Sequence, residues 1–268
     1  MKKKLFYTLL AVGMALAPPL TQAWEPGQGI VGTPHDFTVG NTAGGEMPTI
    51  PPVDANGDPT QEQTDVGVCT FCHTPHKAQS TSLLWNHTLS SSNFSWDVAK
   101  TTAGTDFPTI DGQTYNGATA KCLSCHDGTV SIGDIAWFGE GKPTGTWNSM
   151  KHMAPEAANI ANGADMSGNH PVAMPFPFNN APSTYNGVTT GSGIALDEWQ
   201  TDPTANGIRL FTDNGTGVIT AGATVGKTGI ECSSCHDPHN KQAVDDLFLR
   251  GMLTGSSSDY ICLKCHNK

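Results

Sequence analysis

Eight cysteines are the most reactive residues of this sequence, and they fall into four pairs that share one spacing. In each pair two residues separate the cysteines, and a histidine follows the second cysteine directly. The four pairs use every cysteine of the 268-residue chain, and the intervals between them are irregular, so the pattern marks a repeated site rather than a structural repeat. The sites are Cys69, Cys72 and His73; Cys122, Cys125 and His126; Cys232, Cys235 and His236; and Cys262, Cys265 and His266.

Two thiols at this spacing, followed by an imidazole, form the attachment signature of a c-type haem. The thiols add to the two vinyl groups of the porphyrin, and the imidazole of the next residue then lies beneath the ring, where it binds the iron. Covalent attachment lets a short peptide hold a large cofactor without enclosing it. The sequence therefore predicts four covalently attached haems, with the eight cysteines as anchors and the four adjoining histidines as proximal iron ligands.

Two other uses of paired cysteines compete with haem attachment. Eight cysteines in an exported protein can form four disulfides, and four C-x-x-C pairs can form two zinc ribbons. Neither use requires a histidine after every pair. Because only 10 of 268 residues are histidine, four such coincidences have a probability of roughly 2 in a million. The pattern therefore favours haem over a disulfide or zinc scaffold.

Six further histidines are candidates for the second axial position of the irons. A surplus of histidine favours coordination by two histidines, which keeps the reduction potential low, over coordination by histidine and methionine, which raises it. His170 precedes a proline that stiffens its loop, and His35 lies on an N-terminal arm that can fold back on its own subunit or reach another. We place His35, His76, His170 and His239 first, then His87 and His152, and last Met150, Met153, Met166 and Met174.

The stretch CTFCHTPH, residues 69–76, shows why His76 ranks high. His73 binds from beneath its own haem, and His76 cannot reach around the porphyrin to the opposite face of that iron. Positions i and i+3 of a helical turn project to nearly the same side, so His76 should bind the iron of a second haem close to the first. The stretch CSSCHDPH repeats the arrangement with His236 and His239.

The segments between these sites carry few signals of regular structure. Glycine (30 residues) and proline (18 residues) are abundant and only 37% of the chain is apolar, so the side chains alone supply a small core. Haems would supply the missing apolar surface, and folding should depend on them. We expect mostly irregular coil with short α-helices and a few small β-hairpins, built around four covalently attached haems.

Local patterns predict four regular segments, and prolines exclude regular structure from much of the rest. The strongest helix signal places Val244, Leu247, Phe248 and Leu253 on one side. Asp-Gly and Asn-Gly pairs mark tight turns between apolar stretches. Helices are predicted at residues 66–76 and 241–253, and hairpins at residues 108–118, turning at Asp111-Gly112, and 208–220, turning at Asn214-Gly215.

The N-terminus has the form of a secretory signal peptide. Three lysines precede an apolar run from Leu5 to Ala17, and small residues lead to Ala23, after which we expect cleavage. The apolar run is too short to span a hydrocarbon core of about 30 Å. We expect an exported protein without a membrane span, extracellular or at the cell surface, or alternatively periplasmic. Residues 1–23 would be the signal peptide, 24–65 an extended N-terminal arm and 66–268 the tetrahaem cytochrome domain.

Acidic residues outnumber basic residues by 24 to 14, which gives a net charge of −10. A chain of this charge is a poor partner for nucleic acids and for anionic membrane surfaces. Redox partner cytochromes and extracellular metal oxides remain as the expected partners.

The chain resembles the multihaem c-type cytochromes of metal-reducing bacteria, in the group with doubled C-x-x-C-H motifs. The resemblance rests on the phrases TPHDF, CTFCHTPH, LLWNH, CLSCHDGTV, NHPV and CSSCHDPHN. Four haem sites, a glycine-rich chain and a secretory signal also make it similar to the tetrahaem cytochromes that polymerise into extracellular nanowires. This resemblance implies a homopolymer with a continuous chain of bis-histidine haems, in which one distal histidine, such as His35, can come from the neighbouring subunit.

The leading hypothesis is a tetrahaem cytochrome that carries single electrons along closely packed haems as the subunit of an extracellular conductive filament. One alternative is a monomeric periplasmic electron shuttle. Another is a multihaem reductase with one open iron, against which the histidine supply argues, since ten histidines can fill eight axial positions. In the leading hypothesis no residue is catalytic, because the redox chemistry belongs to the cofactor.

Overall fold

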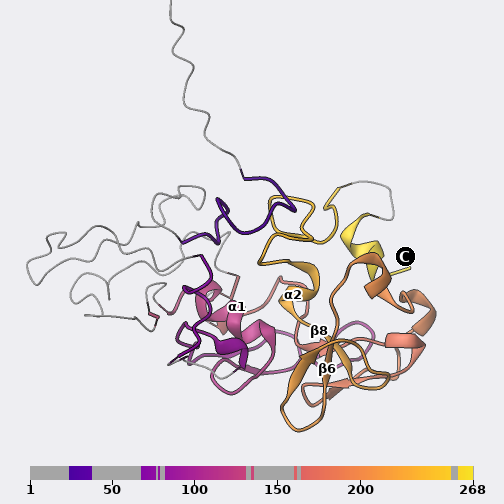
Figure 1. Cartoon of the computed structure of the whole chain (residues 1–268). Helices are drawn as coiled ribbons and strands as arrows, with labels where there is room; N and C mark the ends of the chain where they lie inside the picture. The colour runs from indigo at the N-terminus through magenta and orange to yellow at the C-terminus, as the bar shows by residue number, and fades with distance from the viewer. Residues whose placement is uncertain are drawn as a thin grey trace, which may run out of the picture.

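The computed structural model describes residues 24–37, 68–76, 78, 82–130, 134–135, 160–161, 164–254 and 259–267. Within these residues, turns and irregular segments connect short helices and small sheets (Figure 1). The expected mixture of coil, short helices and small hairpins is therefore confirmed for the described part of the chain. Residues 1–23 and 38–65, the expected signal peptide and most of the expected arm, lie outside it.

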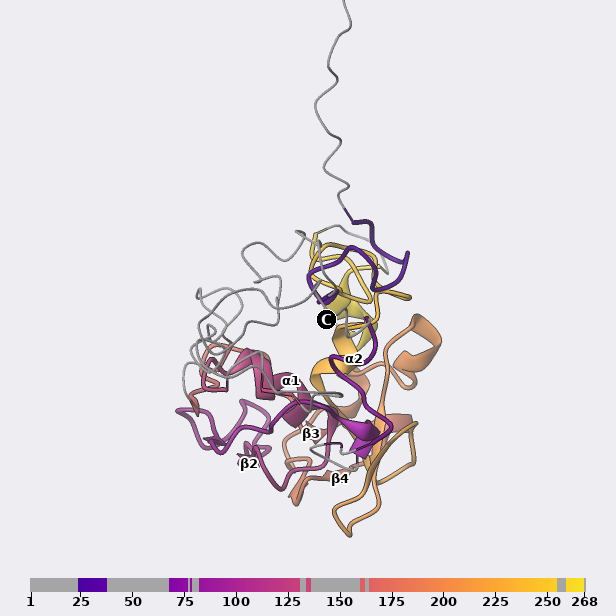
Figure 2. The same ribbon diagram turned by 60° about the vertical axis from the view of Figure 1, so that its left-hand side comes forward.

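The helices of the described part are short, and none of them combines the length and the apolar character needed to cross a membrane. The longest, α1 (Ala118–His126), packs against the single turn α2 (Cys232–Cys235). Figures 1 and 2 both show α1 and α2 side by side. The remaining helical segments are 3-10 turns: η1 (Ser82–Leu84), η4 (Phe178–Asn180), η5 (Leu196–Glu198), η6 (Pro203–Asn206) and η7 (Ile261–Lys264).

The strands of the described part have two or three residues each and pair antiparallel. They are β1 (Asn93–Phe94), β2 (Ile110–Asp111), β3 (Met174–Pro175), β4 (Thr184–Tyr185), β5 (Val188–Thr189), β6 (Phe211–Asp213), β7 (Ile219–Ala221) and β8 (Thr228–Ile230).

One four-stranded sheet, in the order β3–β8–β6–β7, is the largest regular unit of the described chain. The hairpin predicted over residues 208–220 is confirmed as β6–β7, with Asp213 opposite Ile219. The Oδ1 atom of Asn214 accepts a hydrogen bond from the N–H group of Val218, at 3.2 Å, and closes the loop. In β8, a Cβ atom on Gly229 would lie 2.2 Å from the ring of Tyr185, so this position requires glycine.

The hairpin predicted over residues 108–118 is wrong, although a turn is present there. The carboxylate of Asp111 accepts hydrogen bonds from the N–H groups of Gln113 and Thr114, at 2.9 and 3.1 Å, and this turn leads into α1. β2 pairs instead with β1, which comes earlier in the chain, with Phe94 opposite Ile110. Asp111 does form a turn, but the strand that pairs with β2 comes earlier in the chain and does not follow the turn.

The helix predicted over residues 241–253 is also wrong. The carboxylate of Asp245 accepts hydrogen bonds from the N–H groups of Leu247 and Leu249, at 3.0 and 2.9 Å, and Phe248 has a φ angle of 60°. The chain therefore turns back, and the N–H group of Arg250 donates to the carbonyl of Cys235, at 2.8 Å. Backbone groups that a helix would pair internally pair with the third cysteine motif instead.

The helix predicted around residues 66–76 is reduced to one turn in its described part. The N–H group of His73 donates to the carbonyl of Cys69, at 2.8 Å, over a single helical turn. Within the described residues, two clusters of buried side chains support the fold. The first contains Phe94, Trp96, Ile110, Tyr115, Ala120, Leu123, Ala161, Met166 and Ala173, and the second contains Phe176, Ile208 and Leu210.

Candidate haem sites

A helical turn presents each of the four cysteine pairs. The second pair lies in α1, the third forms α2, the fourth lies in η7 and the first forms the isolated turn at residues 69–73. In three of them the histidine N–H group donates to the carbonyl of the first cysteine, at 2.8 Å for His73, 3.0 Å for His236 and 2.9 Å for His266. One turn places both thiols on one side, as attachment to one porphyrin edge requires.

The cysteines do not form the disulfide scaffold considered as an alternative, because all eight are described and all eight are free thiols. Within the described residues, no three histidine, cysteine or acidic side chains converge as a zinc site requires. Burial raises the pKa of Cys72 and of Cys125 to about 12 and that of Cys235 to about 11. Because the thiolate is the nucleophile, attachment at these positions should precede folding.

Three of the four proximal histidines face another histidine across a gap of nearly constant width. A metal–nitrogen bond of about 2 Å on each side, with each ring centre roughly 1.2 Å beyond its nitrogen, would put two axial imidazole centres about 6.4 Å apart. The observed ring centres are separated by 6.1 Å for His35 and His126, 6.1 Å for His73 and His239, and 6.4 Å for His170 and His266.

Hydrogen bonds to backbone carbonyls orient these rings. The Nδ1 atom of His73 bonds to the carbonyl of Leu83, at 2.7 Å, and that of His236 to the carbonyl of Leu247, at 2.8 Å. The Nδ1 atom of His35 bonds to the carbonyl of Pro238, at 3.2 Å. A carbonyl only accepts, so each Nδ1 carries the proton and each Nε2 keeps its lone pair for a metal.

Burial keeps two of the distal candidates in the neutral form that can bind a metal. Burial, and then the nearby charge of His126, lower the pKa of His35 to about 4. Burial also lowers the pKa of His239. Both side chains are therefore uncharged at neutral pH.

The first and third motifs have the same local backbone arrangement. In each, the chain turns away after the histidine and returns after ten or eleven residues to receive the hydrogen bond from its ring. Leucine and valine side chains near these returns are exposed. The exposed fractions are 60% for Leu83 and 49% for Leu84 at the first motif, and 46% for Val244 and 52% for Leu247 at the third. An apolar macrocycle would fit against these groups.

The remaining predicted ligands have different surroundings in the described part of the chain. His236 is exposed, and within the described residues no imidazole faces it at the distance of the other pairs. His76 is exposed, and His87 is buried with its Nδ1 atom bonded to the carbonyl of Thr88, at 2.9 Å. His152, Met150 and Met153 lie outside the described residues, while Met166 and Met174 are buried apolar side chains.

Sequence reasoning missed a buried carboxylate that joins the second and third motifs. Glu231, directly before the third cysteine pair, accepts hydrogen bonds from the hydroxyl groups of Tyr115 and Tyr185, each at 2.5 Å. It also accepts the N–H group of Thr119 in the first turn of α1, at 2.7 Å. Its own N–H group donates to Ser234 at the start of α2, at 2.9 Å. The sequence signal that could have identified Glu231 is its position as an acidic residue directly before a cysteine pair.

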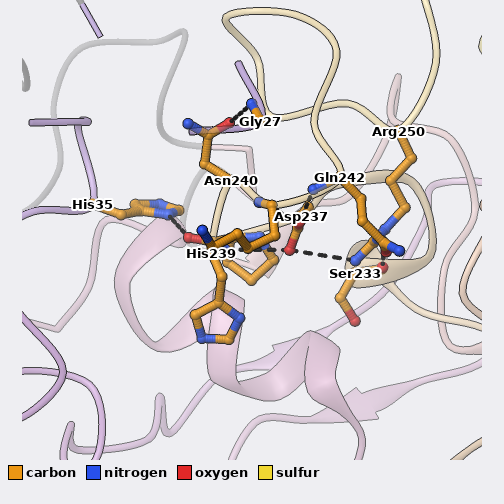
Figure 3. Close-up of polar contacts among 10 residues, drawn as sticks. Gly27, His35, Ser233, Asp237, His239, Asn240, Gln242 and Arg250 are labelled. Atoms are coloured by element: carbon orange, nitrogen blue, oxygen red, sulfur yellow. Dashed lines mark hydrogen bonds and ion pairs between the residues drawn. The ribbon is translucent and has the colours of Figure 1, made fainter. Parts of the chain in front are cut away.

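The loop after the third motif contacts residues of several candidate haem sites (Figure 3). The carboxylate of Asp237 accepts the N–H groups of Lys241 and Gln242, at 2.8 and 2.6 Å, and forms an ion pair with Arg250, at 3.4 Å. Although burial by itself raises the pKa of Asp237, these hydrogen bonds and the Arg250 charge hold that pKa below its usual value. The same loop carries His239.

Residues 224–268 match the family model described as the doubled CXXCH motif. The matched stretch contains the third and fourth cysteine pairs. A search of curated proteins finds no match to the chain. The match supports a relation to multihaem c-type cytochromes, and the motifs indicate a haem-binding protein of the electron-transfer type.

Proposed function

We propose that the protein is a tetrahaem c-type cytochrome that carries single electrons along closely packed bis-histidine haems. We further propose that it acts as the subunit of an extracellular conductive filament that delivers electrons to external acceptors. The observation that carries the first proposal is the set of three facing imidazole pairs, 6.1 to 6.4 Å apart. Each pair joins one motif histidine to one histidine chosen from the sequence as a distal ligand.

In the proposed sites the cysteines would anchor the porphyrins and the motif histidines would bind the irons. The distal ligands are His239 for the first haem, His35 for the second and His170 for the fourth. When bound, haem supplies an iron that alternates between ferrous and ferric forms. The protein residues hold the imidazoles neutral and oriented, and they set the separation between neighbouring haems.

Close packing of the haems follows from how the motifs share residues. His236 and His239 are three residues apart, yet the first belongs to the third site and the second faces His73 of the first site. The side chains of Cys122 and Cys232 interact directly, which brings the attachment points of the second and third haems together. Electron tunnelling falls off exponentially with the gap between rings, so this arrangement favours transfer.

The second axial ligand of the third haem differs between the monomeric shuttle, the filament and the reductase. His76 stands in the first motif where His239 stands in the third, so in a monomeric shuttle His76 would bind the third iron. In the filament, a histidine of a neighbouring subunit fills this position. The exposed ring of His236 also favours a second candidate function, a reductase whose third iron stays open for a small oxyanion.

Mass and optical spectroscopy test the proposed cofactors. The protein purified from a host with haem-maturation machinery should exceed the mass of its processed chain by four haems. The reduced protein should show the sharp split absorption band of six-coordinate haem, and carbon monoxide should leave it unchanged. A smaller mass increase would contradict the tetrahaem assignment, and carbon monoxide binding by the assembled protein would favour the reductase.

Electron microscopy of secreted material tests the filament. Ordered fibres with a repeat of one subunit would support it. Monomers in the periplasm would favour the shuttle. The same proposal includes export of the protein and its acidic charge. It also includes the expected partners, which are other cytochromes or extracellular metal oxides.

A further inference from the structure

We propose that Asn240 is a positioning residue for the distal ligand of the second haem, because it fastens the N-terminal arm that carries His35. This inference rests on the proposed function, in which His35 and His126 bind one iron. Asn240 belongs to the loop after the third motif, so one motif would control the coordination of the haem attached at another.

The side chain of Asn240 is fully buried and uses its polar atoms on the arm. Its Oδ1 atom accepts the N–H group of Gly27, at 2.9 Å. Its Nδ2 atom donates to the carbonyls of Glu25 and Gly29, at 2.8 and 2.9 Å. The backbone carbonyl of Asn240 accepts the N–H group of Gly29, at 2.8 Å. Four hydrogen bonds from one residue therefore hold residues 25–29.

The chain between this attachment and His35 is a series of closed turns. The carbonyl of Ile30 accepts both the N–H group and the hydroxyl of Thr33, at 3.0 and 2.7 Å. The carboxylate of Asp36 accepts the N–H group of Gly32, at 2.7 Å. The hydroxyl of Thr33 in turn accepts the N–H group of His35, at 3.2 Å. Fixing Gly29 thus restricts the position of His35.

The same loop also fixes the ring of His35. Its Nδ1 atom bonds to the carbonyl of Pro238, two residues before Asn240, and its ring stacks on Phe248 with centres 4.8 Å apart. Figure 3 shows His35 pointing toward this loop and the Asn240–Gly27 bond extending from the same loop. The orientation of His35 toward His126 therefore comes from residues that follow the third motif.

The backbone of Asn240 allows its side chain to be tested separately. Asn240 has a φ angle of 51°, in the left-handed region that asparagine and glycine tolerate best. Its N–H group donates to the carbonyl of Asp237, at 2.8 Å, and this bond survives substitution by glycine. Asn240→Gly therefore removes the three side-chain hydrogen bonds to the arm, keeps the backbone bond to Gly29 and preserves the loop.

The test compares carbon monoxide binding by the reduced, fully haem-loaded proteins. His35→Ala, which removes the ligand itself, should add one carbon monoxide per chain over the unsubstituted protein. Asn240→Gly should add a large fraction of the same equivalent and give a high-spin ferric signal in electron paramagnetic resonance. Free imidazole should restore the low-spin spectrum in both variants. Asn214→Gly, in the β6–β7 loop, is the matched control and should add nothing.

A second variant keeps the inference testable if Asn240→Gly folds poorly. Asn240→Asp keeps the acceptor for Gly27 but places a carboxylate oxygen against the carbonyls of Glu25 and Gly29, so it should also release the arm and bind carbon monoxide. Amide hydrogen exchange at Gly27 and Gly29 shows whether the arm has been released. If His35→Ala opens one haem while released variants of Asn240 open none, the inference is overturned and the proposed function stands. If His35→Ala opens no haem, the assignment of His35 under the proposed function fails instead.

Discussion

At the scale of single residues, the proposed function depends on which nitrogen of each histidine is free. The Nδ1–H groups of His73, His236 and His35 each donate a hydrogen bond to a backbone carbonyl. That arrangement leaves the Nε2 lone pair unprotonated and aimed away from the backbone, as an axial ligand must be. Replacement of one ligand should therefore change one haem and leave the others alone.

His239→Met tests the assignment of His239 to the first haem. Methionine as an axial ligand raises the reduction potential of a haem. We expect one of the four potentials to rise on the order of 0.1 V, a fraction of the roughly 0.8 V range that axial ligands span. A spectroelectrochemical titration measures it. Thr216→Met, in the exposed β6–β7 loop, is the control, and an unchanged titration of the His239 variant would remove this ligand from the proposal.

Glu231→Ala tests the buried carboxylate between the second and third motifs. The substitution leaves the hydroxyl groups of Tyr115 and Tyr185 and the N–H group of Thr119 without their acceptor. Since each buried unsatisfied group costs about 1–3 kcal/mol, the free energy of unfolding should fall by at least about 3 kcal/mol. Tyr185→Phe removes only one donor and should cost about 1 kcal/mol. Equal losses in urea unfolding would contradict this account.

At the scale of elements, the loop that follows the third motif has a specific shape because Asp237 organises it. The carboxylate of Asp237 binds two backbone N–H groups and pairs with Arg250, and both side chains are buried. This shape places His239, Pro238 and Asn240 for their separate contacts. A change in the ion pair should therefore act on the whole loop.

Arg250→Met should leave the Asp237 carboxylate buried without its cation. Breaking a buried ion pair on one side costs about 3 kcal/mol or more. The pKa of Asp237 is lowered in the folded chain, so its contribution to stability is complete above the unfolded value near 3.9 and is lost as pH falls through the lowered value. In Arg250→Met that loss should begin at higher pH. Urea unfolding between pH 3 and pH 7 measures both effects. Coinciding curves for the two proteins would contradict the stability loss, and parallel but separated curves would contradict the change in pH dependence.

The structure also shows which elements a sequence reveals. The β6–β7 hairpin was predictable because Asn214-Gly215 joins strands that pair with each other. Residues 241–253 carry a helical apolar pattern, but Leu247 gives its carbonyl to His236 rather than to a helix. The groups that compete for these hydrogen bonds belong to the third motif, so the sequence of residues 241–253 alone does not reveal them. For the same reason the sequence named His35 and His239 as ligands without assigning them to His126 and His73.

At the scale of the whole molecule, the sites are not independent modules. The third motif supplies the anchor of its own haem, the histidine that faces His73 and the contacts that hold His35 opposite His126. The histidine of the fourth motif faces His170 and also lies 4.3 Å from the ring of Trp199. Under the proposed function, haems would add their apolar surface to the clusters of the described chain and contribute to stability.

Removal of single haems should therefore have unequal effects. Replacing both cysteines of the third motif by serine should lower the thermal midpoint more than the same change in the fourth motif, Cys262→Ser with Cys265→Ser. It should remove one haem per chain and also make the first and second haems reactive toward carbon monoxide, because His239 and His35 lose their support. The fourth-motif variant should lose one haem and leave those two sites six-coordinate. Mass spectrometry checks that each variant has lost one haem. Equal thermal midpoints and equal carbon monoxide binding in the two variants would show that the third motif holds no more than its own cofactor.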